Sequence, residues 1–219
     1  MSTCTKETLT EVVARYGGIK SGSHDVDDGA CCILEAISVC DGREWTDSFI
    51  ALDRPDVRPL NDAAWPNDAT RTEQMLRLAP LLEEWPHWSL ARRKAWARRV
   101  ALRTVREVLP IALRAAQIDN ATIAACEQAN GLEAEMAARA ASNTANDFAS
   151  AAAWDSKCAE SDAAKSAVWA GAWAAIACAL AESDPASAAG AAAGSAAVAD
   201  VLVPAVTIWV DESEREVSL

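Results

Sequence analysis

Histidine, tyrosine and phenylalanine are scarce in this chain of 219 residues, and their scarcity limits what the chain can do. There are two histidines, one tyrosine and two phenylalanines. Any pair of a cysteine nucleophile and an imidazole base must therefore use His24 or His87. No segment shows sustained alternation of β-branched and polar residues, so we expect no β-sheet.

Regular cysteine spacing is missing too. The seven cysteines are odd in number and unevenly spaced, which favours free thiols in a reducing cytoplasm over a disulfide framework. Positions 31, 32 and 40 do not give the Cys-x₂-Cys spacing of a zinc site. A calcium loop starting at Asp25 would need a ligand at Ala36. We expect no metal ion and no cofactor.

Targeting and membrane segments are also not expected. A charged, amphipathic stretch follows the first four residues directly, where a signal peptide would be apolar, so we predict a cytoplasmic protein. Residues 166–181 lack charges and residues 185–210 contain only Asp200. The first run is shorter than the roughly 20 residues of a membrane helix, and alanine supplies little apolar surface. We therefore predict no membrane contact.

The overall composition is that of a globular protein. Hydrophobic residues make up 51% and charged residues 24%, and nine tryptophans can anchor a core built largely from small side chains. The net charge is −12, of which residues 111–219 carry −10 from 5 basic and 15 acidic residues. This balance disfavours non-specific binding of nucleic acid or anionic membranes.

Helical periodicity dominates the chain and predicts an all-α fold, a helical bundle with an alanine-rich C-terminal segment. A capping box at Thr8 and Glu11 predicts the first helix start. Residues 43–66 contain three prolines and little periodicity, so we expect a long irregular segment there. Pro80, Pro110 and Pro204 should bend or divide their helices. The predicted helices lie near 8–16, 30–40, 68–82, 89–117, 120–142, 145–182 and 185–213.

A change in composition suggests two regions. Residues 131–200 contain 30 alanines in 70 positions, so we divide the chain into an N-terminal helical domain, 1–118, and an alanine-rich segment, 119–219. Alanine favours helix and lets helices pack closely. The segment could pack within one chain, or form a homo-oligomer through the apolar stripe of Trp169, Trp173, Ile176 and Leu180.

The stretch SGSHDVDDGACCILEA, residues 21–36, is dense in reactive side chains. Cys32 falls in the first turn of a predicted helix, where the helix dipole lowers a thiol pKa. His24 is a candidate base and Glu35 a candidate to orient it, so these three residues could form a catalytic site. The alternative, which we favour, is that an aspartate caps the helix and the cysteines pack as small apolar residues.

A second candidate site is basic. Residues 92–106 carry seven positive and no negative charges. Four arginines share a stripe about 60° wide on a helix, with two tryptophans nearby, a combination that suits phosphates, carboxylates and stacked bases. Alternatively they neutralise the rest of the chain, whose charge is −19. The candidate ligand-binding residues are Arg92, Arg99, Arg103, Arg106, Trp88 and Trp96.

Three segments resemble a family of uncharacterised bacterial and phage-encoded proteins. They read GACCILEAISVCDGREWTD, RPDVRPLNDAAW and RRKAWARRVALRTVREVLPIALRAA, and they hold a Cys-x-x-Glu-Ala helix, a Gly-x-x-Trp-Ser/Thr-Asp turn and an Arg-rich helix. The resemblance covers about the first 130 residues; the alanine-rich tail matches in composition. It implies no particular activity and mildly favours a phage-related accessory protein.

These observations give one leading hypothesis and two alternatives. We expect a non-enzymatic protein that binds a host protein or sequesters a nucleotide-like anion at the Arg-rich helix. The first alternative is a cysteine-dependent hydrolase or transferase that uses Cys32 with His24 or His87. The weaker alternative is nucleic-acid binding along the same arginines, which should be strongly salt-dependent.

Overall fold

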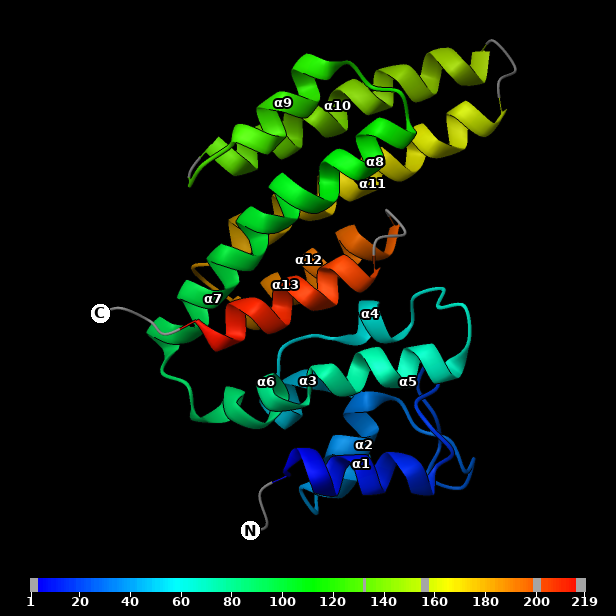
Figure 1. Ribbon diagram of the computed structural model, residues 1–219, viewed down its shortest axis with the longest axis vertical. Coiled ribbons are helices and arrows are strands. Elements are labelled where there is room, and N and C mark those ends of the chain that lie inside the picture. Colours follow the sequence, from blue (N-terminus) through cyan, green and yellow to red (C-terminus); the bar gives the residue numbers. More distant parts are fainter. Residues whose placement is uncertain (1–3, 132, 155–157, 199–201, 216–219) are drawn as a thin grey trace.

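A computed structural model describes residues 4–131, 133–154, 158–198 and 202–215. Helices are stacked along one long axis, with the N-terminus at one end and the pair α9 and α10 at the other (Figure 1). The all-α prediction is confirmed, and the described ranges contain no strand, only a single β-bridge between Ile19 and Cys31. In the same ranges, no helix is long and apolar enough to cross a membrane.

The helices follow one another with short connections, except for two loops near the N-terminus. Their bounds are α1 Lys6–Arg15, α2 Ile33–Cys40, α3 Phe49–Leu52, α4 Arg58–Asn61, α5 Asp68–Arg77, α6 Ala79–Glu84, the 3₁₀ helix η1 Trp85–His87, α7 Leu90–Arg103, the π-helix η2 Thr104–Val108, α8 Leu109–Ala115, α9 Asn120–Gln128, α10 Glu133–Trp154, α11 Cys158–Leu180, α12 Pro185–Val198 and α13 Leu202–Glu214.

Two predicted helix starts are wrong by about one turn. The capping box of α1 joins Thr5 to Thr8, so the helix begins before the predicted Thr8 cap. Helix α2 begins at Ile33 because Cys32 is its N-cap, with the side chain of Glu35 completing the box. The predicted aspartate cap is therefore replaced by a thiol, and residues 19–31 form a loop whose ends meet at the bridge.

The predicted break at Ser142–Asn143 is also wrong, because α10 runs through it. The hydroxyl of Ser142 donates to Val168 O on α11 at 2.9 Å, and the neighbouring Ala141 and Ala145 are fully buried. Packing of small side chains thus overrides weak local propensity. The break before Pro185 is confirmed, and Asp184 caps α12. In the predicted helix 185–213, residues 185–198 form α12 and residues 202–214 form α13, and the stretch between them lies outside the described ranges.

Pro110 leaves the long helix 89–117 continuous in direction but changes its geometry. Ser89 caps α7 as predicted. Pro110 has no N–H for the carbonyl of Arg106, and its ring would clash with that carbonyl. The chain widens into η2 instead, where the N–H of Leu109 donates to Thr104 O, five residues earlier. The run α7–η2–α8 then extends diagonally from beside α13 to beside α9 (Figure 1).

Two hydrophobic cores are arranged along this run. The first holds residues from Cys4 to Val108 together with Ala177–Trp209, and the second holds residues from Val105 to Ala175. A boundary at residue 118 stays a prediction, and both cores cut across it. The first core is centred on the rings of Trp85, Trp88, Trp96 and Trp209, whose centroids lie 5.2 to 6.4 Å apart in the contacting pairs.

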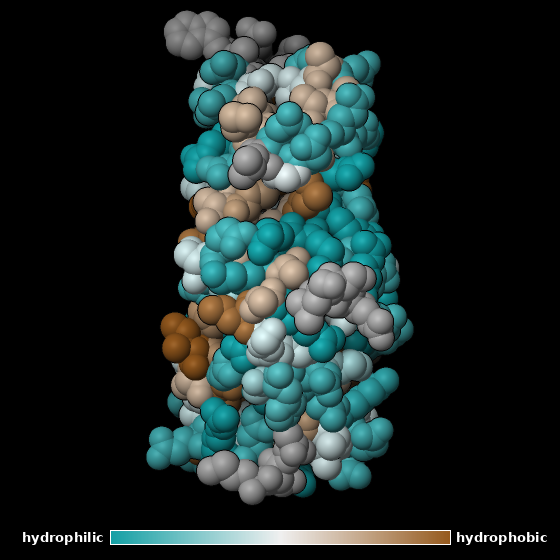
Figure 2. Space-filling view, turned by 90° about the vertical axis from the view of Figure 1, so that its left-hand side faces the viewer, coloured by the Kyte–Doolittle hydropathy of each residue, from teal (hydrophilic) through white to brown (hydrophobic). Residues whose placement is uncertain are grey.

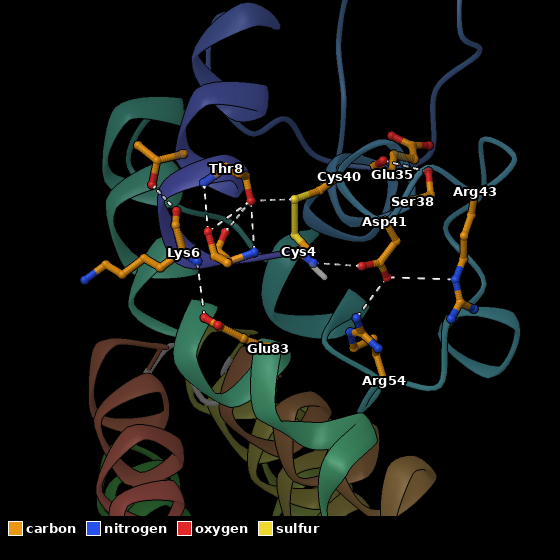
Figure 3. The surroundings of a disulfide bond; sticks show 12 residues. Cys4, Lys6, Thr8, Glu35, Ser38, Cys40, Asp41, Arg43, Arg54 and Glu83 are labelled. Carbon is orange, nitrogen blue, oxygen red and sulfur yellow. Dashed lines mark hydrogen bonds and ion pairs between the residues drawn. A yellow bond between two sulfur atoms is a disulfide. The ribbon is translucent and has the colours of Figure 1, made fainter. Parts of the chain in front are cut away.

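The expectation that all cysteines are free thiols is corrected by the structure. Cys4 and Cys40 form a disulfide, with Cα atoms 5.1 Å apart. It fastens the start of α1 to the end of α2, beside the partly buried Asp41, whose carboxylate accepts from Cys4 N and pairs with Arg54 (Figure 3). Sequence spacing missed the bond because 36 residues separate the two cysteines, and only packing of α1 on α2 brings them together.

Candidate functional site

His24 and Glu35 lie together as expected, but they do not form a relay to Cys32. Oε2 of Glu35 is 3.0 Å from His24 Nδ1 and accepts from Cys32 N at 2.7 Å, while Oε1 accepts from His24 N at 2.6 Å. The thiol of Cys32 accepts from Glu35 N at 3.4 Å. Glu35 is 1% exposed, so its carboxylate holds the loop 19–31 against the start of α2.

The environment of the thiols opposes nucleophilic chemistry. Burial, with a smaller contribution from the charge of Glu35, raises the pKa of Cys31 to about 12. Burial also raises the pKa of Cys32, although its position at a helix start favours the thiolate. Desolvation therefore outweighs the helix dipole, and a neutral thiol is a poor nucleophile. The other candidate base, His87, is exposed on η1.

The Arg-rich helix lines a cleft of about 530 Å³, which we call the arginine cleft. Helices α7 and η2 form one wall, and the ends of α9 and α13 form the other walls. Four arginines and three glutamates give the lining a net charge of +1 in a chain of net charge −12. The lining residues are Arg99, Leu102, Arg103, Arg106, Glu107, Glu127, Glu212 and Arg215.

Arg99 and Arg103 are held by carboxylates at the base of this cleft. The side chain of Glu212 is 0% exposed; its Oε2 lies 2.6 Å from Arg99 Nε and its Oε1 lies 3.3 Å from an Arg103 nitrogen. Arg103 also forms a bidentate pair with Glu107, at 2.6 and 2.9 Å. The hydrogen bond to Glu107 is the largest cause of a raised pKa at Arg103. These guanidinium groups are fixed in place before any ligand arrives.

Arg106 differs from the other two, because it forms no ion pair with any residue in the described ranges. Its Nε donates to the backbone carbonyl of Glu127 at 3.1 Å, and the carboxylate of Glu127 pairs with Arg114 instead. Arg106 lies within η2, and π-helical segments occur frequently at functional sites. The cleft therefore contains one guanidinium whose charge no carboxylate of the described chain offsets directly.

Three of the six predicted ligand residues lie outside the arginine cleft. Trp96 is 0% exposed and packs edge-on against Trp85 and Trp209. Trp88 is 6% exposed, and the guanidinium of Arg92 covers its ring at 4.2 Å from the centroid. The predicted stripe places Arg92 and Arg106 at similar angles on the helix, but 14 residues separate them, about 21 Å along a helix axis.

The prediction also missed residues that complete the cleft. Glu212 lies on α13 and Arg215 directly follows that helix, more than 100 residues after α7 in the chain. No local pattern marks them, since the segment around them is mixed in charge. The sequence indicates only that a helix with so many basic residues needs acidic partners elsewhere in the chain, and it does not say which ones.

Comparisons with known proteins identify no relative of this chain. The chain matches no protein-family model, no curated protein and no solved structure. The resemblance to phage-encoded proteins therefore stays a prediction.

Proposed function

We propose that this chain is a binding protein rather than an enzyme, and that it holds a small anion in the arginine cleft. The observation that carries the proposal is the convergence of four arginines on one cleft of net positive charge, in a chain of net charge −12. Its volume of about 530 Å³ lies within the range of small-molecule sites, about 300–1,000 Å³.

Arg106 is the residue that we expect to contact the anion directly. A planar guanidinium gives two parallel hydrogen bonds to a phosphate or carboxylate. Arg99 and Arg103 would contribute positive charge near the anion without pairing with it directly, because Glu212 and Glu107 already bind their guanidinium groups. A site of this kind needs little rearrangement when the anion enters, which lowers the entropic cost of binding.

Titration calorimetry with inorganic phosphate at low ionic strength tests the proposal. Arg106→Gln should weaken binding at least about tenfold, the loss of one charge-assisted hydrogen bond. Arg92→Gln is the matched control, since it removes the same charge from the same helical run outside the cleft. Equal weakening by both variants, or no binding by the native chain, would refute a site in the cleft.

The compartment and the biological setting are part of the proposal too. We propose a cytoplasmic, phage-related accessory role, on the sequence grounds and the resemblance given above. In a reducing cytoplasm Cys4 and Cys40 would be thiols. Trapping of thiols in intact cells therefore tests the location, and an oxidised pair would argue for another compartment.

Self-association through α11 is a second, separate proposal. Trp169 and Trp173 are 60% and 38% exposed, and Ile176 beside them is 40% exposed, so part of the predicted stripe faces solvent. Light scattering across a range of concentrations tests it, with Trp169→Ser as the variant. A native chain that stays monomeric at high concentration would refute it.

A further inference from the structure

A second cavity, of about 370 Å³, lies beside the arginine cleft on an adjacent face of α7. We call it the apolar cavity, because its wall is formed mainly by the small side chains of α7, the start of α10 and the end of α11. Arg98 and Glu182 form an ion pair of 2.6 Å at its rim, and both are more than half exposed. The lining residues are Arg98, Arg99, Ala101, Leu102, Gly131, Ala134, Cys178, Ala181 and Glu182.

The two cavities adjoin each other. Arg99 and Leu102 line both of them, so one side of each residue faces the arginine cleft and the other side faces the apolar cavity. The side of the molecule that carries α7 and the ends of α9 and α13 has a hydrophilic band across its middle, with brown and tan hydrophobic surface directly adjoining it (Figure 2). Hydrophilic and hydrophobic surface thus lie next to each other on this face.

We propose that the natural ligand is a small anionic amphiphile, with a phosphate or carboxylate head in the arginine cleft and an apolar chain in the apolar cavity. This inference rests on the proposed function and names its ligand class. The head pairs with Arg106, the chain crosses Leu102, and its end packs among Ala134, Cys178 and Ala181. Burial of apolar surface supplies affinity, while the arginines supply orientation and select for negative charge.

A series of alkyl phosphates tests this assignment against inorganic phosphate. Each buried methylene is worth about 0.8 kcal/mol, so affinity should rise about fourfold per methylene until the apolar cavity is full. Arg106→Gln should weaken every member of the series by a similar factor. Phosphate binding that depends on Arg106 but gains nothing from the chain would overturn the amphiphile and leave the proposed function standing. No binding of phosphate or hexyl phosphate would overturn both.

Cys178 provides a direct readout of occupancy in the unaltered protein. It is partly exposed and lines the apolar cavity, so hexyl phosphate should slow its modification by N-ethylmaleimide, measured by mass spectrometry. Cys126 is the internal control, because it is fully buried in the core formed by α8, α9, α10 and α11, outside both cavities. Equal slowing at both cysteines would show general stabilisation and contradict the assignment.

A variant that fills the apolar cavity gives a further test. Cys178→Phe should abolish the increase in affinity with alkyl chain length and leave the affinity for inorganic phosphate unchanged. Should this variant unfold, the labelling of the native chain still decides the question.

Vesicles of phosphatidylglycerol distinguish binding of a free amphiphile from binding of a lipid headgroup in a membrane. Binding to vesicles without binding of hexyl phosphate would overturn the proposal.

Discussion

Nε of Arg99 on α7 lies 2.6 Å from Oε2 of Glu212 on α13, and the side chain of Glu212 is 0% exposed. The two residues are 113 apart in sequence, and their pair joins α7 to α13 at the base of the arginine cleft. Arg103 and Arg215 contact the other oxygen of the same carboxylate, at 3.3 and 3.2 Å. One buried charge thus organises three of the four arginines in the cleft.

Glu212→Gln should destabilise the protein while strengthening anion binding. The change leaves the cationic groups without their shared carboxylate, and we expect a loss of about 1–3 kcal/mol in the free energy of unfolding. It also raises the net charge of the cleft by one, so phosphate should bind more tightly. Urea titration and calorimetry measure the two effects. Glu214→Gln, at the exposed end of α13 and outside the lining of the cleft, is the matched control for loss of charge alone.

Charge reversal at Arg99 and Arg103 should act mainly on the fold. The double variant Arg99→Glu with Arg103→Glu places two carboxylates beside the buried Glu212, and uncompensated buried charge costs about 3–5 kcal/mol. Circular dichroism with thermal unfolding checks this, and we expect a strongly lowered midpoint. A loss of phosphate binding in this variant would then be a consequence of unfolding and would not identify Arg99 and Arg103 as ligand contacts. Retention of native stability would show that Glu212 does not depend on these two arginines.

Cys32 should behave as a helix cap. Its thiol accepts the hydrogen bond that a serine hydroxyl makes at the same position, so Cys32→Ser should change the free energy of unfolding by less than about 1 kcal/mol. Cys32→Ala should cost about 1 kcal/mol more than the serine variant. Denaturant unfolding of both variants measures the difference. Rapid alkylation of native Cys32 at neutral pH would contradict this assignment and revive the cysteine enzyme.

The thiols of Cys31, Cys126 and the partly buried Cys178 should make stability fall in alkaline solution. Burial raises the pKa of Cys31 to about 12 and those of Cys126 and Cys178 to about 11, from an ordinary value of 9.0. Because the folded pKa lies above the unfolded one, the folded state binds these protons more tightly. The stabilisation is complete below pH 9 and is lost as pH rises toward 11 and 12. Unfolding free energies from pH 8 to 11 test this, and Cys126→Ala should flatten the curve.

Reduction of the Cys4–Cys40 disulfide should lower stability by about 2–4 kcal/mol, since the bond closes a loop between residues 36 apart. Unfolding with and without dithiothreitol measures the loss. The variant Cys4→Ser with Cys40→Ser should match the reduced protein and be insensitive to the reductant. Sensitivity of the double variant would show that another cysteine is responsible.

Local sequence determined the helices and several of their ends. Ser89 and Asp184 cap helices as short polar side chains do wherever they precede a helical pattern. Pro110 altered its helix because a missing N–H is a local property. The all-α fold followed from periodicity alone, since helical hydrogen bonds close within four residues. The arginine stripe was also visible, because angular position on a helix depends only on spacing.

Tertiary structure decided what those side chains do. Trp96 and Arg106 lie on one predicted helix, yet one is buried against Trp209 and the other lies in an open cleft. Helix α10 continues through Ser142 because α11 supplies an acceptor for its hydroxyl. The carboxylate that fixes Arg99, and the cysteine that bonds Cys40, come from distant parts of the chain. Helix packing determines which of these distant residues come into contact, and no local sequence pattern specifies them.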